Sequence, residues 1–170
     1  SCWVKRTKIP DPNYSFFLGC FAGNNNNGYA TIGFKDNDSL LWSSYSSNFF
    51  ETEQKFRDAS AWMHVVISVD TTISAPNEDN RIRLYVNGSE VTEFSTRNNP
   101  SLSMDLAINM AGVHYIGSTG NGIFDGYLAN IHLVEGLQLD ASSFGMTDAT
   151  TGQWVPKDYT GTYGTNGFHL

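Results

Sequence analysis

The sequence predicts an all-β fold, a two-sheet antiparallel β-sandwich, on three observations. Apolar and polar residues alternate over several short segments, as they do in strands with one buried face. Clusters of Gly, Asn, Asp and Pro separate these segments. No segment repeats apolar residues at helical spacing over several turns, so alternating helices and strands are not expected.

The clearest local prediction is a β-hairpin at Asn87-Gly88. Residues 81–86 alternate before it, and their three aliphatic side chains are expected to face the core. An Asn-Gly pair supplies the two positive φ angles that a two-residue hairpin turn needs. Residues 90–94 are expected to form the return strand.

Further strands are expected on the same grounds. Residues 62–70 form the longest, with Met63, Val65, Ile67 and Val69 on one face. The others are expected at residues 1–6, 16–22, 29–34, 40–43, 113–117 and 127–134. Turns are expected at residues 24–28, 36–38, 76–80 and 120–122, and one helical turn within 139–144.

Length and composition indicate one domain spanning residues 1–170. The chain is 40% hydrophobic and 14% aromatic, more than a disordered chain would carry, and no linker or second core can be recognised. It starts at Ser1 without an initiator Met, already in strand-like alternation, so we expect a fragment of a longer polypeptide.

The charge balance argues against two classes of partner. Ten basic and seventeen acidic residues give a formal net charge of −7. The basic residues are scattered, whereas nucleic-acid binding usually needs a basic stripe, so no nucleic-acid partner is expected. Apolar runs such as 63–67 are far shorter than the roughly 20 residues of a membrane span, so no membrane insertion is expected.

Cys2 and Cys20 fall in segments expected to be neighbouring strands. A cross-strand disulfide and a pair of buried thiols both fit this arrangement. We favour the thiols, because two cysteines do not make a disulfide framework.

Four segments in order resemble laminin G-like and pentraxin-like members of the concanavalin A-like lectin/glucanase superfamily. They are residues 1–6 (SCWVKR), 61–66 (AWMHVV), 84–88 (LYVNG) and 124–131 (FDGYLANI). The resemblance implies a jelly roll over nearly the whole chain. Two departures stand out: Ala129-Asn130 replaces an acidic pair of many relatives, and a strand that usually precedes the Trp3 segment is missing, which could leave an open edge.

The C-terminal part resembles virion proteins of marine bacteriophages. The matching pieces are Ser143-Phe144-Gly145, residues 148–152 (DATTG), Trp154, Pro156-Lys157, residues 159–161 (YTG) and residues 163–168 (YGTNGF). In those proteins the domain typically decorates tail fibres or other appendages. The resemblance implies a virion location, an oligomeric assembly, and either a host cell-surface glycan or other virion proteins as partners.

No residue pattern indicates catalysis. The glucanase branch needs an E-x-D-x-x-E strand, and Glu51 and Glu53 alternate without a third acid. There is no Gly-x-Ser-x-Gly elbow, and the four His residues lie apart, without metal-ligand spacing. We therefore expect no enzyme.

Sugar binding needs aromatic faces and planar polar groups, and one predicted sheet face offers both. If the two strands adjoin, His64, Ser68, Arg83 and Tyr85 form a platform opposite the core. An ordinary solvated face explains the same pattern. Trp42 is a further aromatic candidate, although a large aromatic is more often in the core.

Calcium is common at loop rims in the superfamily that the chain resembles, so it is a possible cofactor. Oxygen ligands gather at Asp36 and Asp38, and again at Glu78 and Asp79. Both clusters are equally good turn compositions. The leading hypothesis is a non-catalytic carbohydrate-binding domain of a phage structural protein. The alternatives are a purely structural interaction module and a glucanase-type enzyme.

Overall fold

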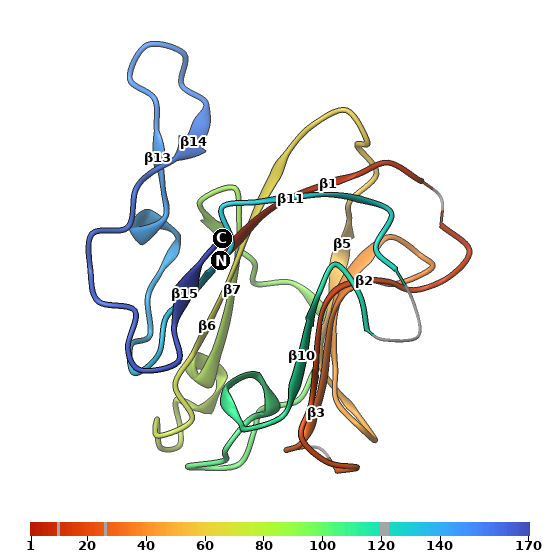
Figure 1. Cartoon of the computed structure of the whole chain (residues 1–170), viewed down its shortest axis with the longest axis vertical. Helices are drawn as coiled ribbons and strands as arrows, with labels where there is room; N and C mark the ends of the chain where they lie inside the picture. The colour runs from red at the N-terminus through yellow and green to blue at the C-terminus, as the bar shows by residue number, and fades with distance from the viewer. Residues whose placement is uncertain (10, 26, 120–122) are drawn as a thin grey trace.

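The computed structural model describes residues 1–9, 11–25, 27–119 and 123–170 (Figure 1). Within these ranges the strands form two main antiparallel sheets that face each other, which confirms the predicted β-sandwich. The five-stranded sheet has the order β11-β1-β6-β7-β8, from β1 (Cys2–Arg6), β6 (Met63–Val69), β7 (Ile82–Val86), β8 (Ser89–Glu90) and β11 (Gly126–Ala129). The six-stranded sheet has the order β10-β2-β3-β4-β5-β9, from β2 (Ser15–Phe21), β3 (Tyr29–Phe34), β4 (Ser39–Ser43), β5 (Asn48–Lys55), β9 (Phe94–Arg97) and β10 (Val113–Ile116).

The remaining elements are short. Three 3-10 turns are described: η1 (Glu78–Arg81), η2 (Ala107–Asn109) and η3 (Ala141–Ser143). Two two-stranded ribbons come from β12 (His132–Leu133) with β15 (Phe168–His169), and from β13 (Gly145–Thr147) with β14 (Trp154–Pro156). The β13–β14 ribbon projects from the body of the sandwich (Figure 1). No described helix has the length and apolarity to cross a membrane.

Most predicted strands are confirmed to within one or two residues, and the helical turn is found as η3. The predicted strand 127–134 is interrupted, because Asn130 adopts a positive φ of 46° between β11 and β12. The predicted return strand 90–94 is wrong in extent: it ends at Glu90, and the chain then crosses to pair β9 with β5. The turn predicted at 120–122 lies outside the described residues.

The edge expected beside the first strand is not open. β1 pairs with β6 on one side and with β11 on the other, so its backbone groups are in ladders on both sides. The argument for a partner strand docking beside β1 therefore fails.

The hairpin turn at Asn87-Gly88 is confirmed, with φ angles of 49° and 84°. Replacing Gly88 with Ala is expected to lower the free energy of unfolding by about 1–3 kcal/mol. The added Cβ would strain the left-handed backbone and would lie 2.7 Å from the Trp154 ring.

The matched control for this turn is Gly136→Ala. Gly136 has a φ of 82°, but no described atom lies within 4 Å of the added Cβ. Urea unfolding should therefore show a smaller decrease in the free energy of unfolding for Gly136→Ala than for Gly88→Ala. Equal losses would mean that Trp154 does not pack against the hairpin.

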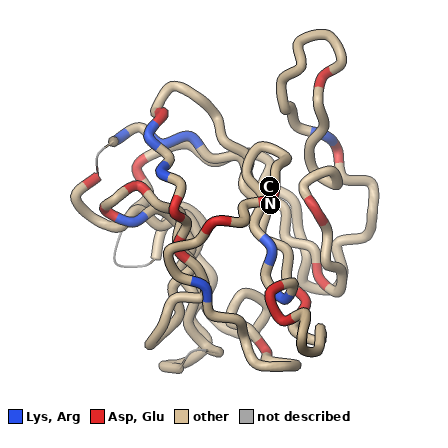
Figure 2. Tube along the Cα trace, turned by 180° about the vertical axis from the view of Figure 1, so that it is seen from behind, with Lys and Arg blue, Asp and Glu red and all other residues tan. Residues whose placement is uncertain are grey.

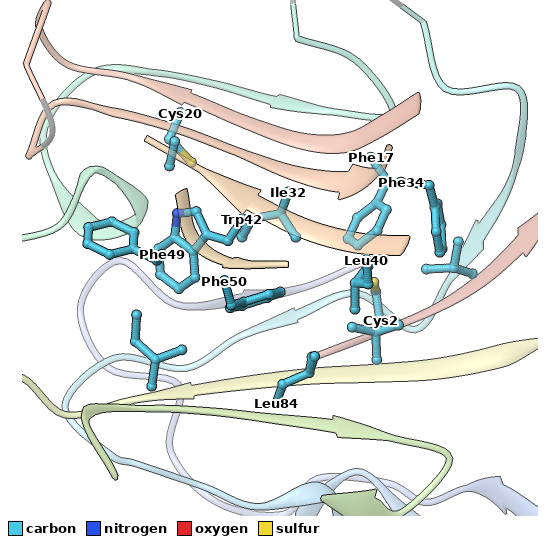
Figure 3. Packing of buried hydrophobic residues seen from close by; sticks show 14 of the residues in the cluster. Cys2, Phe17, Cys20, Ile32, Phe34, Leu40, Trp42, Phe49, Phe50 and Leu84 are labelled. Atoms are coloured by element: carbon cyan, nitrogen blue, oxygen red, sulfur yellow. The ribbon is translucent and has the colours of Figure 1, made fainter. Parts of the chain in front are cut away.

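The main core lies between the two sheets (Figure 3). Aromatic side chains dominate it, with Trp42 packed edge-on against Phe49 and Phe50 at ring-centroid distances of 5.4 and 6.2 Å. Aliphatic side chains of β6 and β7 face the same space, as the alternation predicts. Burying these apolar surfaces supplies the main driving force for folding.

Cys2 and Cys20 are both buried and unbonded, which confirms the thiol interpretation. The expectation that they sit on neighbouring strands is wrong, because β1 and β2 belong to opposite sheets (Figure 3). Burial raises the pKa of the Cys2 thiol to about 11 and that of Cys20 to about 12. Both are inert core thiols at neutral pH.

Candidate carbohydrate-binding site

The predicted platform has the expected strand arrangement but is not open to solvent. β6 and β7 are adjacent, and Ser68 pairs with Arg83 in their register. However, His64, Ser68 and Tyr85 are only 0%, 5% and 6% exposed. The expectation of an accessible platform is therefore wrong for these three side chains.

The C-terminal segment covers this face. Val66 of β6 and Tyr85 of β7 form a second buried cluster with Ala141 and Phe144, and partly buried side chains complete it. Those side chains are Val134, Leu139, Trp154 and Tyr159. The outer face of β6 and β7 is thus the floor of a second core.

His64 contacts Trp154 of the covering segment, and also Ser1 and Trp3. The indole N–H of Trp154 donates to Nδ1 of His64 at 2.9 Å, and the Nε2 of His64 lies 2.9 Å from the Ser1 hydroxyl. The Trp3 ring stacks on the imidazole at a centroid distance of 4.9 Å. Burial lowers the pKa of His64 to about 4, so it is neutral at pH 7 and serves to anchor Trp154.

Arg83, the remaining platform residue, and Trp42, the further aromatic candidate, are also engaged. Nε of Arg83 donates to Glu90 at 2.8 Å, and this bond raises the pKa of the guanidinium. Trp42 is 0% exposed and points into the main core, away from any surface (Figure 3). The structure therefore does not bring the five predicted ligand-binding residues together at one accessible place.

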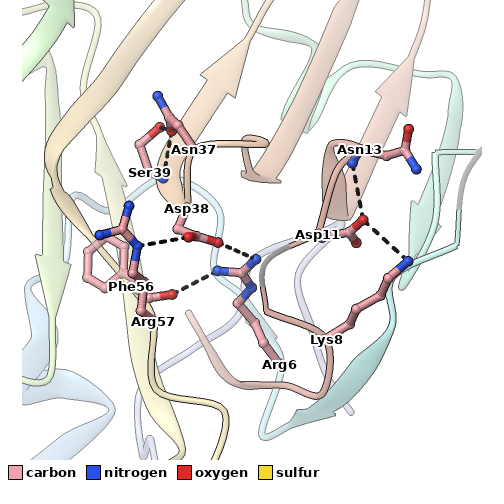
Figure 4. Close-up of polar contacts among 9 residues, drawn as sticks. All are labelled: Arg6, Lys8, Asp11, Asn13, Asn37, Asp38, Ser39, Phe56 and Arg57. Atoms are coloured by element: carbon pink, nitrogen blue, oxygen red, sulfur yellow. Dashed lines mark hydrogen bonds and ion pairs between the residues drawn. The ribbon is translucent and has the colours of Figure 1, made fainter.

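The predicted calcium ligands do not converge either. Asp38 is buried and its carboxylate lies 3.0 Å from both Arg6 and Arg57 (Figure 4). Asp36, in the same turn, is exposed. Among the described residues, no group of three or more His, Cys, Asp or Glu side chains is placed to hold a metal ion.

The second acidic cluster, Glu78 and Asp79, lies in the turn around η1. The Asp79 carboxylate accepts a hydrogen bond from Asn99 at 2.6 Å and lies 3.8 Å from the Arg97 guanidinium. Glu78 begins the same 3-10 turn. These contacts support the interpretation of both acidic clusters as turns.

A different site lies on the outer face of the six-stranded sheet, where four aromatic rings meet. We call Phe21, Tyr29, Tyr45 and Tyr115 the aromatic patch. Phe21 is central, with ring centroids 4.9 Å from Tyr29 and 5.8 Å from Tyr115, and Tyr29 lies 6.3 Å from Tyr45. All three contacts are edge-to-face, and Phe21, Tyr29 and Tyr115 are partly buried.

Backbone pairing brings these rings together. Phe21 pairs with Tyr29 at the end of the β2–β3 ladder and with Val113 of β10 on its other side. Tyr115 pairs with Gly19, where the Phe21 ring and the Thr119 backbone both lie 3.1 Å from the position that a Cβ would take. Tyr45 lies in the loop between β4 and β5 and is 56% exposed.

Polar groups surround the aromatic patch. The turn that joins β2 to β3 carries Asn25, whose side chain accepts hydrogen bonds from the backbone N–H groups of Asn27 and Gly28. On the Tyr45 side, the Ser44 hydroxyl donates to the Ser47 carbonyl. Asn26, part of the turn predicted at 24–28, lies outside the described residues.

Two of the four residues of the aromatic patch could have been found from the sequence. In the predicted strands 16–22 and 29–34, Phe21 and Tyr29 lie opposite Cys20 and Ala30 in the alternation and must therefore point away from the core. Tyr45 and Tyr115 could not be added from the sequence, because their positions depend on strand order and on a loop.

A second exposed aromatic pair lies on the other sheet. Trp62 and Tyr127 are 41% and 59% exposed, and their ring centroids are 6.4 Å apart. Only two rings meet here, so we use this pair as a comparison for the aromatic patch.

Comparison with known proteins identifies the family of this chain. No curated protein matches the sequence. Among solved structures, a native heptameric SAP-like pentraxin from Limulus polyphemus matches with 19% identity and a TM-score of 0.45. The match covers 76% of this chain and 59% of the pentraxin chain. Residues 1–142 match the family described as the concanavalin A-like lectin/glucanases superfamily, and the chain belongs to that superfamily.

Proposed function

We propose that this domain is a non-catalytic carbohydrate-binding module whose site is the aromatic patch. The observation that carries the proposal is the meeting of four rings on the outer face of the six-stranded sheet, where Tyr45 is 56% exposed. The C–H groups of a pyranose ring can pack on a tyrosine face, while its hydroxyls bind nearby polar groups. Asn25 and the tyrosine hydroxyls supply such groups.

The shape of the site predicts the mode of binding. An open sheet face buries less of a sugar than a deep pocket does, so a single site should bind weakly. Several domains on one assembly would raise the apparent affinity by avidity. We therefore propose that the domain acts in an oligomeric assembly.

The state of the carboxyl groups supports a non-catalytic role. A general acid for glycoside hydrolysis needs a raised pKa. Six described carboxyl groups have a lowered pKa, which does not suit them to this role: Glu51, Asp58, Asp70, Glu90, Glu135 and Asp148. Burial opposes ionisation of Glu51, but hydrogen bonds from Asn37, Lys35 and Ser39 outweigh it.

We also propose that the domain is displayed on a bacteriophage particle, where it binds a host cell-surface glycan or packs against other virion proteins. The resemblance of residues 143–168 to phage virion proteins supports this setting. These residues lie beyond the family match at 1–142 and include the projecting β13–β14 ribbon. Lys and Arg lie dispersed among Asp and Glu along the chain, which supports neutral or polar partners over nucleic acid (Figure 2).

A glycan array tests this function directly. The domain should be displayed as an oligomer and probed with calcium and again with a chelator. We expect reproducible binding to a related set of glycans in both conditions, lost in Tyr45→Ala. Binding that vanishes with the chelator would instead implicate the acidic turns, and silence from folded protein would favour the structural module.

A further inference from the structure

A cavity of about 840 Å³ lies beside β6, on the opposite side of the six-stranded sheet from the aromatic patch, and it reaches from the space between the two sheets to the second core. Its wall is mostly aliphatic and is built from both sheets and from the segments that follow β9 and β11. Side chains that form this wall include Leu18, Ile67, Ile108, Ile116, Leu128 and Ile131. The volume falls within the roughly 300–1,000 Å³ that small-molecule sites occupy in proteins.

The main core leaves this wall incompletely covered. Leu18, Ile67, Ile108 and Leu128 pack against the main core but are only partly buried, and Ile116 is 38% exposed. An apolar ligand in the cavity would remove these surfaces from water, which is favourable in proportion to the area covered.

The charged side chains at the cavity have one sign. Asp70, Asp105 and Glu135 line it, and none of the described lining residues is Lys or Arg. The α-amino group of Ser1 also lines it, but this group donates to the His132 carbonyl at 2.9 Å and burial lowers its pKa. Hydrogen bonds from Thr72 lower the pKa of Asp70, and hydrogen bonds from Asn109 and Asn166 lower that of Glu135, so both stay ionised. A carboxylate or sulfate head group near these three carboxylates would be repelled, whereas an ammonium group there would be attracted.

We propose that this cavity binds a small ligand with an apolar body and a cationic head, that is, an alkyl or aryl ammonium compound. The apolar body lies along the aliphatic wall, and the ammonium group lies at the acidic margin. The proposal is independent of the glycan function, because the two sites lie on different sides of the six-stranded sheet.

Three probes of equal chain length separate the contribution of the head-group charge from that of the apolar chain. They are octylammonium, octanol and octanoate, and their affinities are measured at pH 7 by calorimetry. We expect octylammonium to bind about tenfold or more tightly than octanoate, with octanol between them. Isoleucine methyl NMR locates the site. Octylammonium should shift the signals of Ile67, Ile108 and Ile131, which line the cavity, and leave the core residue Ile82 unchanged.

Two variants and a control complete the test. Ile116→Trp, at the partly exposed wall, should abolish binding by filling the space. Asp105→Asn, at an exposed position, should weaken the binding of octylammonium about two- to fivefold and leave that of octanol unchanged. Glu53→Gln, an exposed acid outside the cavity, should change nothing. Equal binding of octanoate and octylammonium, or no shift at the three lining isoleucines, would overturn the proposal.

Discussion

Replacing Asp38 with Ala is expected to lower the free energy of unfolding by about 3–5 kcal/mol. Its carboxylate is the counter-ion of Arg6, whose side chain is 4% exposed. Arg6 also donates to the Phe56 carbonyl at 2.7 Å and lies over the Phe34 ring (Figure 4). Without Asp38 a guanidinium stays buried with no opposite charge, which is among the costliest single changes in a protein.

The same variant separates an ion-pair role from a calcium role. The loss in the free energy of unfolding, measured by urea unfolding, should be the same with calcium present and with a chelator. Asp36→Ala is the control in the same turn and should change stability by less than about 0.5 kcal/mol, because Asp36 is exposed. A loss that appears only in calcium would show that Asp38 is a metal ligand after all.

Acidification should destabilise the domain through His64 by up to about 3 kcal/mol. Burial holds the pKa of His64 at about 4 in the folded state, against 6.5 for a free histidine. Between these values the unfolded chain binds a proton that the folded chain does not. The contribution of His64 is therefore fully present above about pH 6.5, falls as the pH drops toward 4, and changes no further below that.

His64→Gln isolates this effect. The glutamine can still accept a hydrogen bond from Trp154 but has no proton to gain. The free energy of unfolding of this variant should depend less on pH between 6.5 and 4 than that of the parent. Identical slopes for His64→Gln and the parent would contradict the buried, neutral state of His64.

The sequence predicted the sandwich because most of its signals are local. Asn87-Gly88 specifies a turn whatever surrounds it, and alternation in 62–70 and 81–86 specifies strands. β5 was not predicted as a strand, because its pairing shifts register at both neighbours. Phe49 and Phe50 are consecutive and both buried, so the alternation that marks a strand is lost there.

The covered sheet face could not be predicted in the same way. Residues 145–169 fold as short ribbons and turns, which carry little periodic signal. The best indication was Val66 and Tyr85, two apolar side chains on a face expected to be solvated. They require a cover, and the structure supplies it with Ala141 and Phe144. Because of this tertiary contact, the face predicted to be an exposed platform is buried in a second core.

The aromatic patch depends on relationships that a single sequence does not contain. Its outward strand residues follow from alternation, but their meeting depends on β10 lying beside β2. Glycan binding through this patch is the central claim. The most direct test measures the affinity of the parent and of two variants for a glycan identified on the array. Tyr45→Ala should weaken binding about tenfold, whereas Tyr127→Ala should not. The reverse result, or equal affinity for all three proteins, would contradict the claim.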